Sequence, residues 1–219
     1  MKHLIVSFFI LIIPLQMNYG QTTKTNHILI IDKTGSMVGK PTGSGNEDIW
    51  EEVKTAIKKY IDVIEIEDRI SIYFFAEKIE GPSVFNINEQ SDLDEAKQFV
   101  DNIEADGQYT CTYNSLNSVI DNFKQQNQGY KNWIFLYTDG NNTCSGYTME
   151  QVADAFNAKR DDDDYIYYIS LGNPVPEEVE RAATSNEGIL VQWIPEPGKV
   201  IEPPPIIKPK PRKIIVKIK

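Results

Sequence analysis

The chain has 219 residues, 41% of them hydrophobic and 25% charged, which suits one buried core of ordinary size with short appendages. Its formal net charge is −10. Residues 198–219 hold seven basic residues and one acidic residue, and residues 1–20 hold one basic residue, which leaves residues 21–197 with −17. So acidic a body excludes nucleic-acid binding, which needs a basic surface. It favours attraction of cations, although an acidic surface also serves solubility.

Residues 1–20 have the pattern of an export signal. Lys2 precedes an apolar run at residues 4–13 that is short for a membrane span, and the small residue Gly20 follows at the expected cleavage point. An uncleaved membrane anchor is the alternative, because Asn18 is a poor residue near a cleavage site. No other segment is apolar enough to cross a bilayer, so we expect a secreted, periplasmic or cell-surface protein.

Two cysteines, Cys111 and Cys144, remain after removal of the signal. In an oxidising compartment this even number predicts one disulfide, whereas in a cytosol both would stay thiols. Two cysteines and two scattered histidines offer too few ligands of the kind that zinc needs, so a zinc site is excluded.

The first predicted strand is the continuous apolar run from His27 to Ile31, which ends at Asp32. Continuous rather than alternating apolar runs are typical of strands buried on both faces, as in a parallel sheet. Further runs predict strands at residues 70–75, 133–137, 165–169 and 189–194, and a short antiparallel edge strand at 83–87.

Helices are predicted between these strands, because apolar residues recur there at helical spacing. They fall at residues 49–64, 91–103, 112–123, 148–159 and 176–183. Asn46 or Ser44 is expected to cap the first, and Thr148 and Gln151 to form a capping box for the fourth. The alternation predicts a doubly wound, Rossmann-like α/β fold at residues 21–195: a three-layer sandwich around a mostly parallel sheet with one antiparallel edge strand.

Residues 196–219 form a basic tail rich in proline, which favours stiff, extended polyproline II conformation. The simplest interpretation is a linker with a solvated end, which is the run Lys213–Lys219. Two alternatives are a basic contact to an anionic surface and a strand that adds to another sheet edge.

The candidate site lies where buried strands end. Asp32 and Asp139 each follow an apolar run directly, and ligands of open α/β sheets bind beyond the carboxyl ends of the strands. Thr34 and Ser36 add hydroxyls at alternate positions of the first loop, and Thr110 adds a third from another loop. Carboxylate, hydroxyl and water oxygens are the ligands that Mg²⁺ or another hard cation prefers.

These segments resemble the metal-ion-dependent adhesion site of von Willebrand factor A domains. The likeness covers residues 25–195. The family's first motif is Asp-x-Ser/Thr-x-Ser, which Asp32-Lys33-Thr34-Gly35-Ser36 matches; Thr110-Cys111-Thr112-Tyr113 resembles the second segment and Thr138-Asp139-Gly140 the third. A tighter glycine-rich turn is usual where this chain has Gly107-Gln108-Tyr109-Thr110, so Thr112 is the alternative to Thr110.

The resemblance implies a site that holds a divalent cation, Mg²⁺ first and Mn²⁺ or Ca²⁺ as alternatives. It implies that Thr34, Ser36 and Thr110 ligate the metal, and that Asp32 and Asp139 act directly or through water. An open coordination position would accept an acidic side chain of a partner protein. The implied function is adhesion or another metal-dependent protein–protein interaction, without enzymatic activity.

One enzyme class remains as the alternative. The segment Asp32–Ser36 is also similar to the phosphorylated loop of the haloacid dehalogenase class, and Asp139–Asn142 to that class's Mg²⁺ motif. Asp32 would then be the nucleophile of a phosphatase. Two features count against it: Thr34 stands where that class carries a second acid, and no acid occurs at residues 142 and 143.

Overall fold

The computed structural model describes residues 24–39, 48–126, 129–140 and 142–195. The predicted signal peptide at residues 1–20 and the predicted tail at 196–219 lie outside these residues. Within the described part of the chain, no helix has both the length and the apolar character needed to cross a bilayer.

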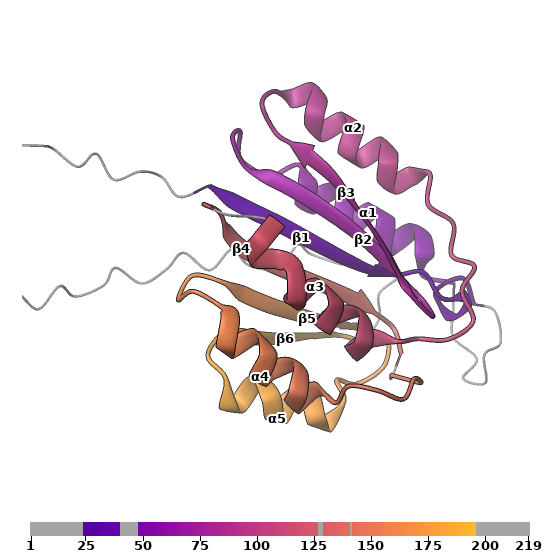
Figure 1. Cartoon of the computed structure of the whole chain (residues 1–219). Helices are drawn as coiled ribbons and strands as arrows, with labels where there is room; N and C mark the ends of the chain where they lie inside the picture. Colours follow the sequence, from indigo (N-terminus) through magenta and orange to yellow (C-terminus); the bar gives the residue numbers. More distant parts are fainter. Residues whose placement is uncertain (1–23, 40–47, 127–128, 141, 196–219) are drawn as a thin grey trace, which may run out of the picture.

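Six strands form one sheet in the order β3-β2-β1-β4-β5-β6 (Figure 1). Every neighbouring pair is parallel except β2 and β3, which are antiparallel. The predicted α/β fold with one antiparallel edge strand is therefore confirmed. The strands are β1 (Thr25–Asp32), β2 (Arg69–Phe75), β3 (Ile79–Asn86), β4 (Lys131–Thr138), β5 (Tyr165–Leu171) and β6 (Ile189–Ile194).

Helices cover both faces of the sheet, which gives the predicted three layers. Helices α1 and α2 share one buried cluster with the sheet, and α3, α4 and α5 share a second cluster on the opposite face. A short 3₁₀ helix, η1, follows β1. The helices are η1 (Gly35–Met37), α1 (Trp50–Ile61), α2 (Gln90–Asp101), α3 (Thr112–Gln126), α4 (Met149–Lys159) and α5 (Glu177–Ser185).

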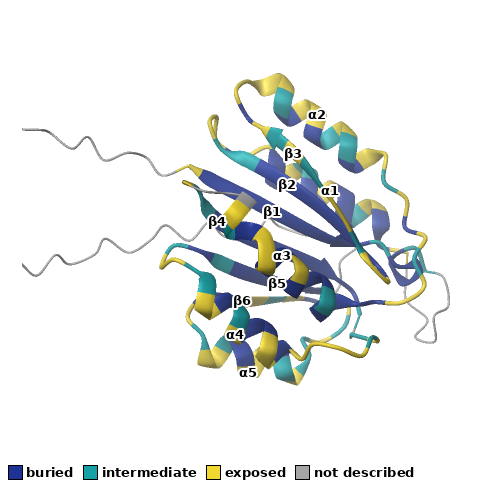
Figure 2. Cartoon of the chain, in the orientation of Figure 1, coloured by how far each residue is buried: buried dark blue, intermediate teal, exposed yellow. Residues whose placement is uncertain are grey.

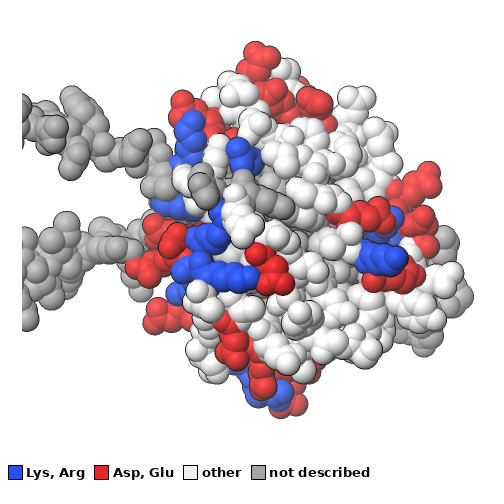
Figure 3. Space-filling model, viewed as in Figure 1, with Lys and Arg blue, Asp and Glu red and all other residues white. Residues whose placement is uncertain are grey.

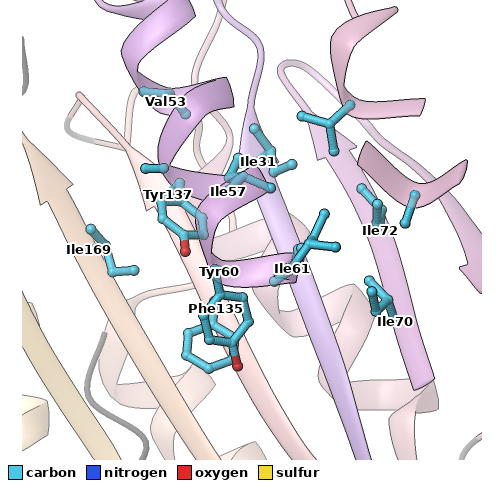
Figure 4. Close-up of a cluster of buried hydrophobic side chains, with 14 of the residues drawn as sticks. Ile31, Val53, Ile57, Tyr60, Ile61, Ile70, Ile72, Phe135, Tyr137 and Ile169 are labelled. Carbon is cyan, nitrogen blue, oxygen red and sulfur yellow. The ribbon is translucent and has the colours of Figure 1, made fainter. Parts of the chain in front are cut away.

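The central strand β1 is buried along its whole length (Figure 2). Successive side chains of a strand point to opposite faces. Leu29 and Ile31 accordingly pack in the cluster under α1 and α2, whereas Ile28 and Ile30 pack under α3–α5. Burial on both faces explains the continuous apolar run of the sequence. Figure 4 shows the α1 side of this core, where Ile57 lies close to Ile31.

The helix starts agree only in part with the predicted caps. Thr148 and Gln151 form the predicted capping box: the Thr148 N–H donates to Gln151 Oε1 (2.9 Å) and the Gln151 N–H donates to Thr148 Oγ1 (3.3 Å). The cap predicted for α1 is wrong. Ser44 and Asn46 lie outside the described residues, and the helix begins later, at Trp50, whose N–H donates to Asp48 Oδ1 (3.2 Å).

The two cysteines form the predicted disulfide, Cys111–Cys144. Cys111 directly precedes α3, and Cys144 lies in the loop between β4 and α4. The bridge therefore joins two loops at the end of the sheet where the parallel strands terminate.

Truncation of a core side chain tests the packing of α1. Ile57 is fully buried, whereas Ile66 is 50% exposed. We expect Ile57→Ala to lower the free energy of unfolding by about 2–5 kcal/mol, because it removes buried apolar atoms and leaves a cavity. Ile66→Ala, the matched control, should change it by less than about 0.5 kcal/mol. Urea denaturation measures both, and equal effects would contradict the packing described.

The disulfide gives a second test of stability. It closes a loop with a sequence separation of 33, so the double variant Cys111→Ala/Cys144→Ala should lose about 3–4 kcal/mol of unfolding free energy on the chain-entropy account. The same denaturation experiment measures the loss. Thiol alkylation of the unfolded, unreduced protein followed by intact-mass analysis is the control, and labelling of both cysteines would refute the bridge.

Candidate metal centre

Two carboxylates meet at one edge of the sheet. Asp32 is the last residue of β1, and Asp139 directly follows the last residue of β4. The two strands are parallel neighbours, with Ile31 opposite Tyr137. Neighbouring parallel strands end at the same edge, on the right in Figure 1, so the fold itself brings the carboxylates together.

The loop after β1 links these carboxylates through one backbone N–H and two hydroxyl groups. Asp32 Oδ1 accepts a hydrogen bond from the Thr34 N–H (2.9 Å). Thr34 Oγ1 lies 2.9 Å from Ser36 Oγ, and Ser36 Oγ donates to Asp139 Oδ1 (3.0 Å). Because Ser36 gives its proton to Asp139, Thr34 is the donor to Ser36. Four of the five predicted site residues therefore form one hydrogen-bonded set.

The second predicted loop is fastened to the first by its backbone. The Gly35 N–H donates to the Gly107 carbonyl (2.8 Å), and the Gly107 N–H donates to the Lys33 carbonyl (3.1 Å). A Cβ atom at Gly107 would lie 2.1 Å from the Ala76 Cβ, so only glycine permits this approach. Residues 107–110 lack the tighter glycine-rich turn that is usual in the family. They keep Gly107, the one glycine that this contact requires.

Thr110 reaches the loop of Asp139. The Thr143 N–H donates to the Thr110 carbonyl (2.9 Å), and the Thr110 N–H donates to Thr143 Oγ1 (3.0 Å). The Thr110 hydroxyl lies 3.6 Å from the position of a Cβ built on Gly140. Thr112, its alternative, is fully buried at the start of α3, and its hydroxyl has no hydrogen-bond partner among the described residues.

Two further residues support the site, and sequence reasoning missed both. Thr138 Oγ1 donates to Asp32 Oδ2 (2.6 Å), so both oxygens of Asp32 accept hydrogen bonds. The Asn173 amide donates to the Asp139 carbonyl. The sequence could have identified Thr138, because it is a hydroxyl residue directly before Asp139 at the end of a predicted strand. Asn173 could not be identified in this way, because it follows another strand 34 residues later.

The electrostatics of the pair are unfavourable without a cation. Asp32 is 0% exposed and Asp139 is 1% exposed. Burial, and then the charge of Asp139, raise the pKa of Asp32 to about 7, although hydrogen bonds from Thr138 and Thr34 act in the opposite direction. Lys33 does not relieve the repulsion, because its ammonium pairs with Glu80 (3.1 Å) and Asp106 (3.3 Å).

The donor set fits a hard divalent cation better than a soft one. In the described ranges, no three residues among histidine, cysteine, aspartate and glutamate cluster as a metal-binding group. The site instead offers two carboxylates and neutral hydroxyls, all of them oxygen donors. A divalent charge at this position would offset the repulsion between the two buried carboxylates.

Comparisons with known proteins agree with this fold. The family model described as von Willebrand factor type A domain matches residues 28–192. No curated protein sequence matches the chain.

Among solved structures, a von Willebrand factor type A protein from Catenulispora acidiphila is 20% identical, with a TM-score of 0.62 over 80% of this chain and 40% of that one. Proximal thread matrix protein 1 from the mussel byssus is 18% identical, with a TM-score of 0.61 over 81% of this chain and 45% of that one. A second structure of the mussel protein has zinc in its metal-ion-dependent adhesion site (MIDAS) motif. It is 17% identical, with a TM-score of 0.61 over 81% of this chain and 45% of that one. The chain thus spans less than half the length of these proteins.

The family match extends over more than half of the chain, from β1 to β6. At these low identities the solved structures show the fold alone, and they agree with it. The chain belongs to the von Willebrand factor type A domain family.

Proposed function

We propose that this domain binds one divalent cation at the carboxyl ends of β1 and β4. It uses the cation to capture an acidic side chain of a protein partner. The observation that carries the proposal is the hydrogen-bonded set Asp32–Thr34–Ser36–Asp139, with Thr110 beside Gly140. It gathers oxygen donors from three loops around two buried carboxylates.

The residues divide into two roles. The hydroxyls of Thr34, Ser36 and Thr110 are the proposed direct ligands, while Asp32 and Asp139 bind directly or through water. Two carboxylates nearly balance a divalent charge, and hydroxyls add none, so a bound cation would remain Lewis acidic towards one more anionic oxygen. Thr138 holds Asp32 in place through Oδ2.

Mg²⁺ is the proposed metal, with Mn²⁺ and Ca²⁺ as alternatives, because all the donors are oxygens. The mussel byssus structure with zinc in its MIDAS motif adds zinc to the cations that need testing.

The charge of the body indicates where the attraction to a partner must come from. On the face shown in Figure 3, acidic side chains occur in several places around the body, and the lysines and arginines, most of them on the left, lie next to acidic side chains. Residues 21–197 carry −17, so the body repels an acidic ligand at long range. An acidic partner is therefore held locally, at the cation, and nucleic acid is not a proposed partner.

Export is part of the proposal. The predicted signal at residues 1–20 and the Cys111–Cys144 bridge both fit an oxidising, extracytoplasmic compartment. The similar structures include a protein of the mussel byssus and a pilus adhesin of Lactobacillus rhamnosus GG. We place this chain outside the cytoplasm, secreted, periplasmic or at the cell surface.

Metal binding is tested by replacing Asp32. Calorimetry of the wild type with Mg²⁺, Mn²⁺, Ca²⁺ and Zn²⁺ should show one site, and metal should raise the melting temperature because it binds only the folded state. Asp32→Asn should show neither effect. The metal-free variant should stay folded, because the substitution removes a buried charge and keeps the side-chain size.

Glu65→Gln, which changes an exposed carboxylate before the start of β2, at the opposite end of the sheet, is the matched control and should bind like the wild type. Equal metal binding by Asp32→Asn and the wild type would exclude the assigned site.

Partner capture is tested at Thr110. Proteins that bind the immobilised wild type in Mg²⁺ and elute with chelator are identified by mass spectrometry, and their affinity is then measured by interferometry. Thr110→Val keeps the side-chain shape but removes the hydroxyl, so it should weaken this binding while the unfolding free energy changes little. Partner binding that survives excess chelator would show that the cation has only a structural role.

The phosphatase alternative predicts a different result. Both oxygens of Asp32 accept hydrogen bonds and the residue is fully buried, which does not favour an attacking nucleophile. We expect p-nitrophenyl phosphate turnover in Mg²⁺ to be no faster for the wild type than for Asp32→Asn. Turnover that depends on Asp32 would support the enzyme instead.

A further inference from the structure

The two edges of the sheet differ in how they are protected against pairing with another strand. Edge strands expose unpaired backbone groups, and proteins protect them with proline, charge or irregular register. β3 has all three: Pro82, Glu80 and a register shift against β2 between Ile72 and Phe74. β6 has none, since its sequence, Ile-Leu-Val-Gln-Trp-Ile, contains neither charge nor proline and its register against β5 is regular.

The unprotected edge also exposes large apolar side chains. Trp193 is 52% exposed and Val191 is 40% exposed. Both share a face of β6 with Ile189, which is buried in the cluster under α3–α5. Ile189 shares that cluster with Val179 and Ala182 of α5, whereas Val191 and Trp193 stay accessible, so a strand added here would bury apolar surface as well as pair the backbone.

The sequence contains a segment of matching character that the proposed metal site does not use. In Lys213–Lys219 the residues alternate with period two. Ile214, Val216 and Ile218 fall on one face, and Lys213, Lys217 and Lys219 fall on the other together with Ile215. β-branched residues with this alternation are typical of a half-buried strand. The lysines at its ends keep such a segment soluble when it is unpaired.

We propose that the segment Lys213–Lys219 of one copy of this chain adds as a strand to β6 of another copy, with Ile214, Val216 and Ile218 against Val191 and Trp193. Strand addition to an exposed edge gives affinity through main-chain hydrogen bonds and specificity through alternate side chains. The proposal does not depend on metal binding.

The residues between β6 and this segment favour a second copy over the same one. Pro203, Pro204, Pro205, Pro209 and Pro211 fall in the nine residues from 203 to 211. In polyproline II such a stretch spans about 28 Å, whereas a six-residue strand spans about 20 Å. Because this length exceeds that of β6, the proposal assigns the segment to a second copy rather than to its own sheet.

Charge supports the encounter between copies. The tail from residue 198 on carries +6 and residues 21–197 carry −17, so the tail of one copy is attracted to the body of another. This attraction raises the association rate and weakens at high salt.

Sedimentation velocity of the purified full chain over a range of concentrations tests the proposal. The wild type should associate reversibly, and chelator should have no effect. Val216→Pro removes a strand N–H and Val191→Lys places a charge on the exposed face of β6, so each should weaken association about tenfold or more. Acrylamide quenching follows Trp193 in the same samples, because Trp50 and Trp133 are only 5% and 7% exposed; association should protect it.

Two matched controls keep the test specific. Ile206→Pro makes the same kind of substitution within the proline-rich spacer, and Val84→Lys places the same charge on β3, where Val84 is 48% exposed. Both should associate like the wild type.

Three results would overturn the proposal: a wild type that stays monomeric with Trp193 open to quencher, association unchanged by Val216→Pro, or association lost equally in Val84→Lys. A monomer with Trp193 protected at every concentration would also overturn it, since the segment would then pair within its own chain. Retained metal binding in associating and non-associating variants separates this test from that of the proposed function.

Discussion

The repulsion between two buried carboxylates is the constraint around which this domain is arranged. Asp32 and Asp139 stand at the ends of adjacent parallel strands, shielded from water. A buried charge without compensation strongly destabilises a fold. The chain spreads the cost over hydrogen bonds from Thr34, Ser36 and Thr138, which are neutral donors and leave the negative charge in place. The proposed cation would offset this repulsion, so its binding would be linked to folding.

The surrounding loops hold this arrangement in position. The loop at residues 105–110 pairs with the loop after β1 through Gly107, and with the loop after β4 through Thr110 and Thr143. The Cys111–Cys144 bridge covalently joins the end of the loop before α3 to the loop after β4. Oxygen atoms from three distant parts of the sequence are thus pre-positioned, so the proposed cation would cost little conformational entropy on binding.

Local sequence patterns predicted the fold well, because a strand buried on both faces needs a continuous apolar run, which can be recognised in the sequence. The apolar runs that end at Ile31 and Tyr137 predicted that Asp32 and Asp139 lie at the carboxyl ends of buried strands. Long-range contacts leave no such pattern. Asn173 supports Asp139 from another strand end, and Gly107 is required only because Ala76 lies against it. The cap of α1 was also predicted wrongly: Ile49 stands at the N-cap position, and the Trp50 N–H donates to Asp48, which nothing in the local sequence distinguishes from other loop residues.

The proposed metal site at the carboxyl ends of β1 and β4 and the proposed docking surface on the edge strand β6 are separate surfaces, so both can be used at once. Strand addition uses the backbone of β6 and the side chains of Val191 and Trp193, none of which belongs to the set around Asp32 and Asp139. An assembled copy therefore keeps its metal site open. Several sites carried on one assembly bind a multivalent acidic surface far more tightly than one site does, because each capture raises the effective concentration of the next. Weak metal-mediated contacts would then suffice for firm attachment, and loss of the segment Lys213–Lys219 would lower attachment without changing the affinity of any single site.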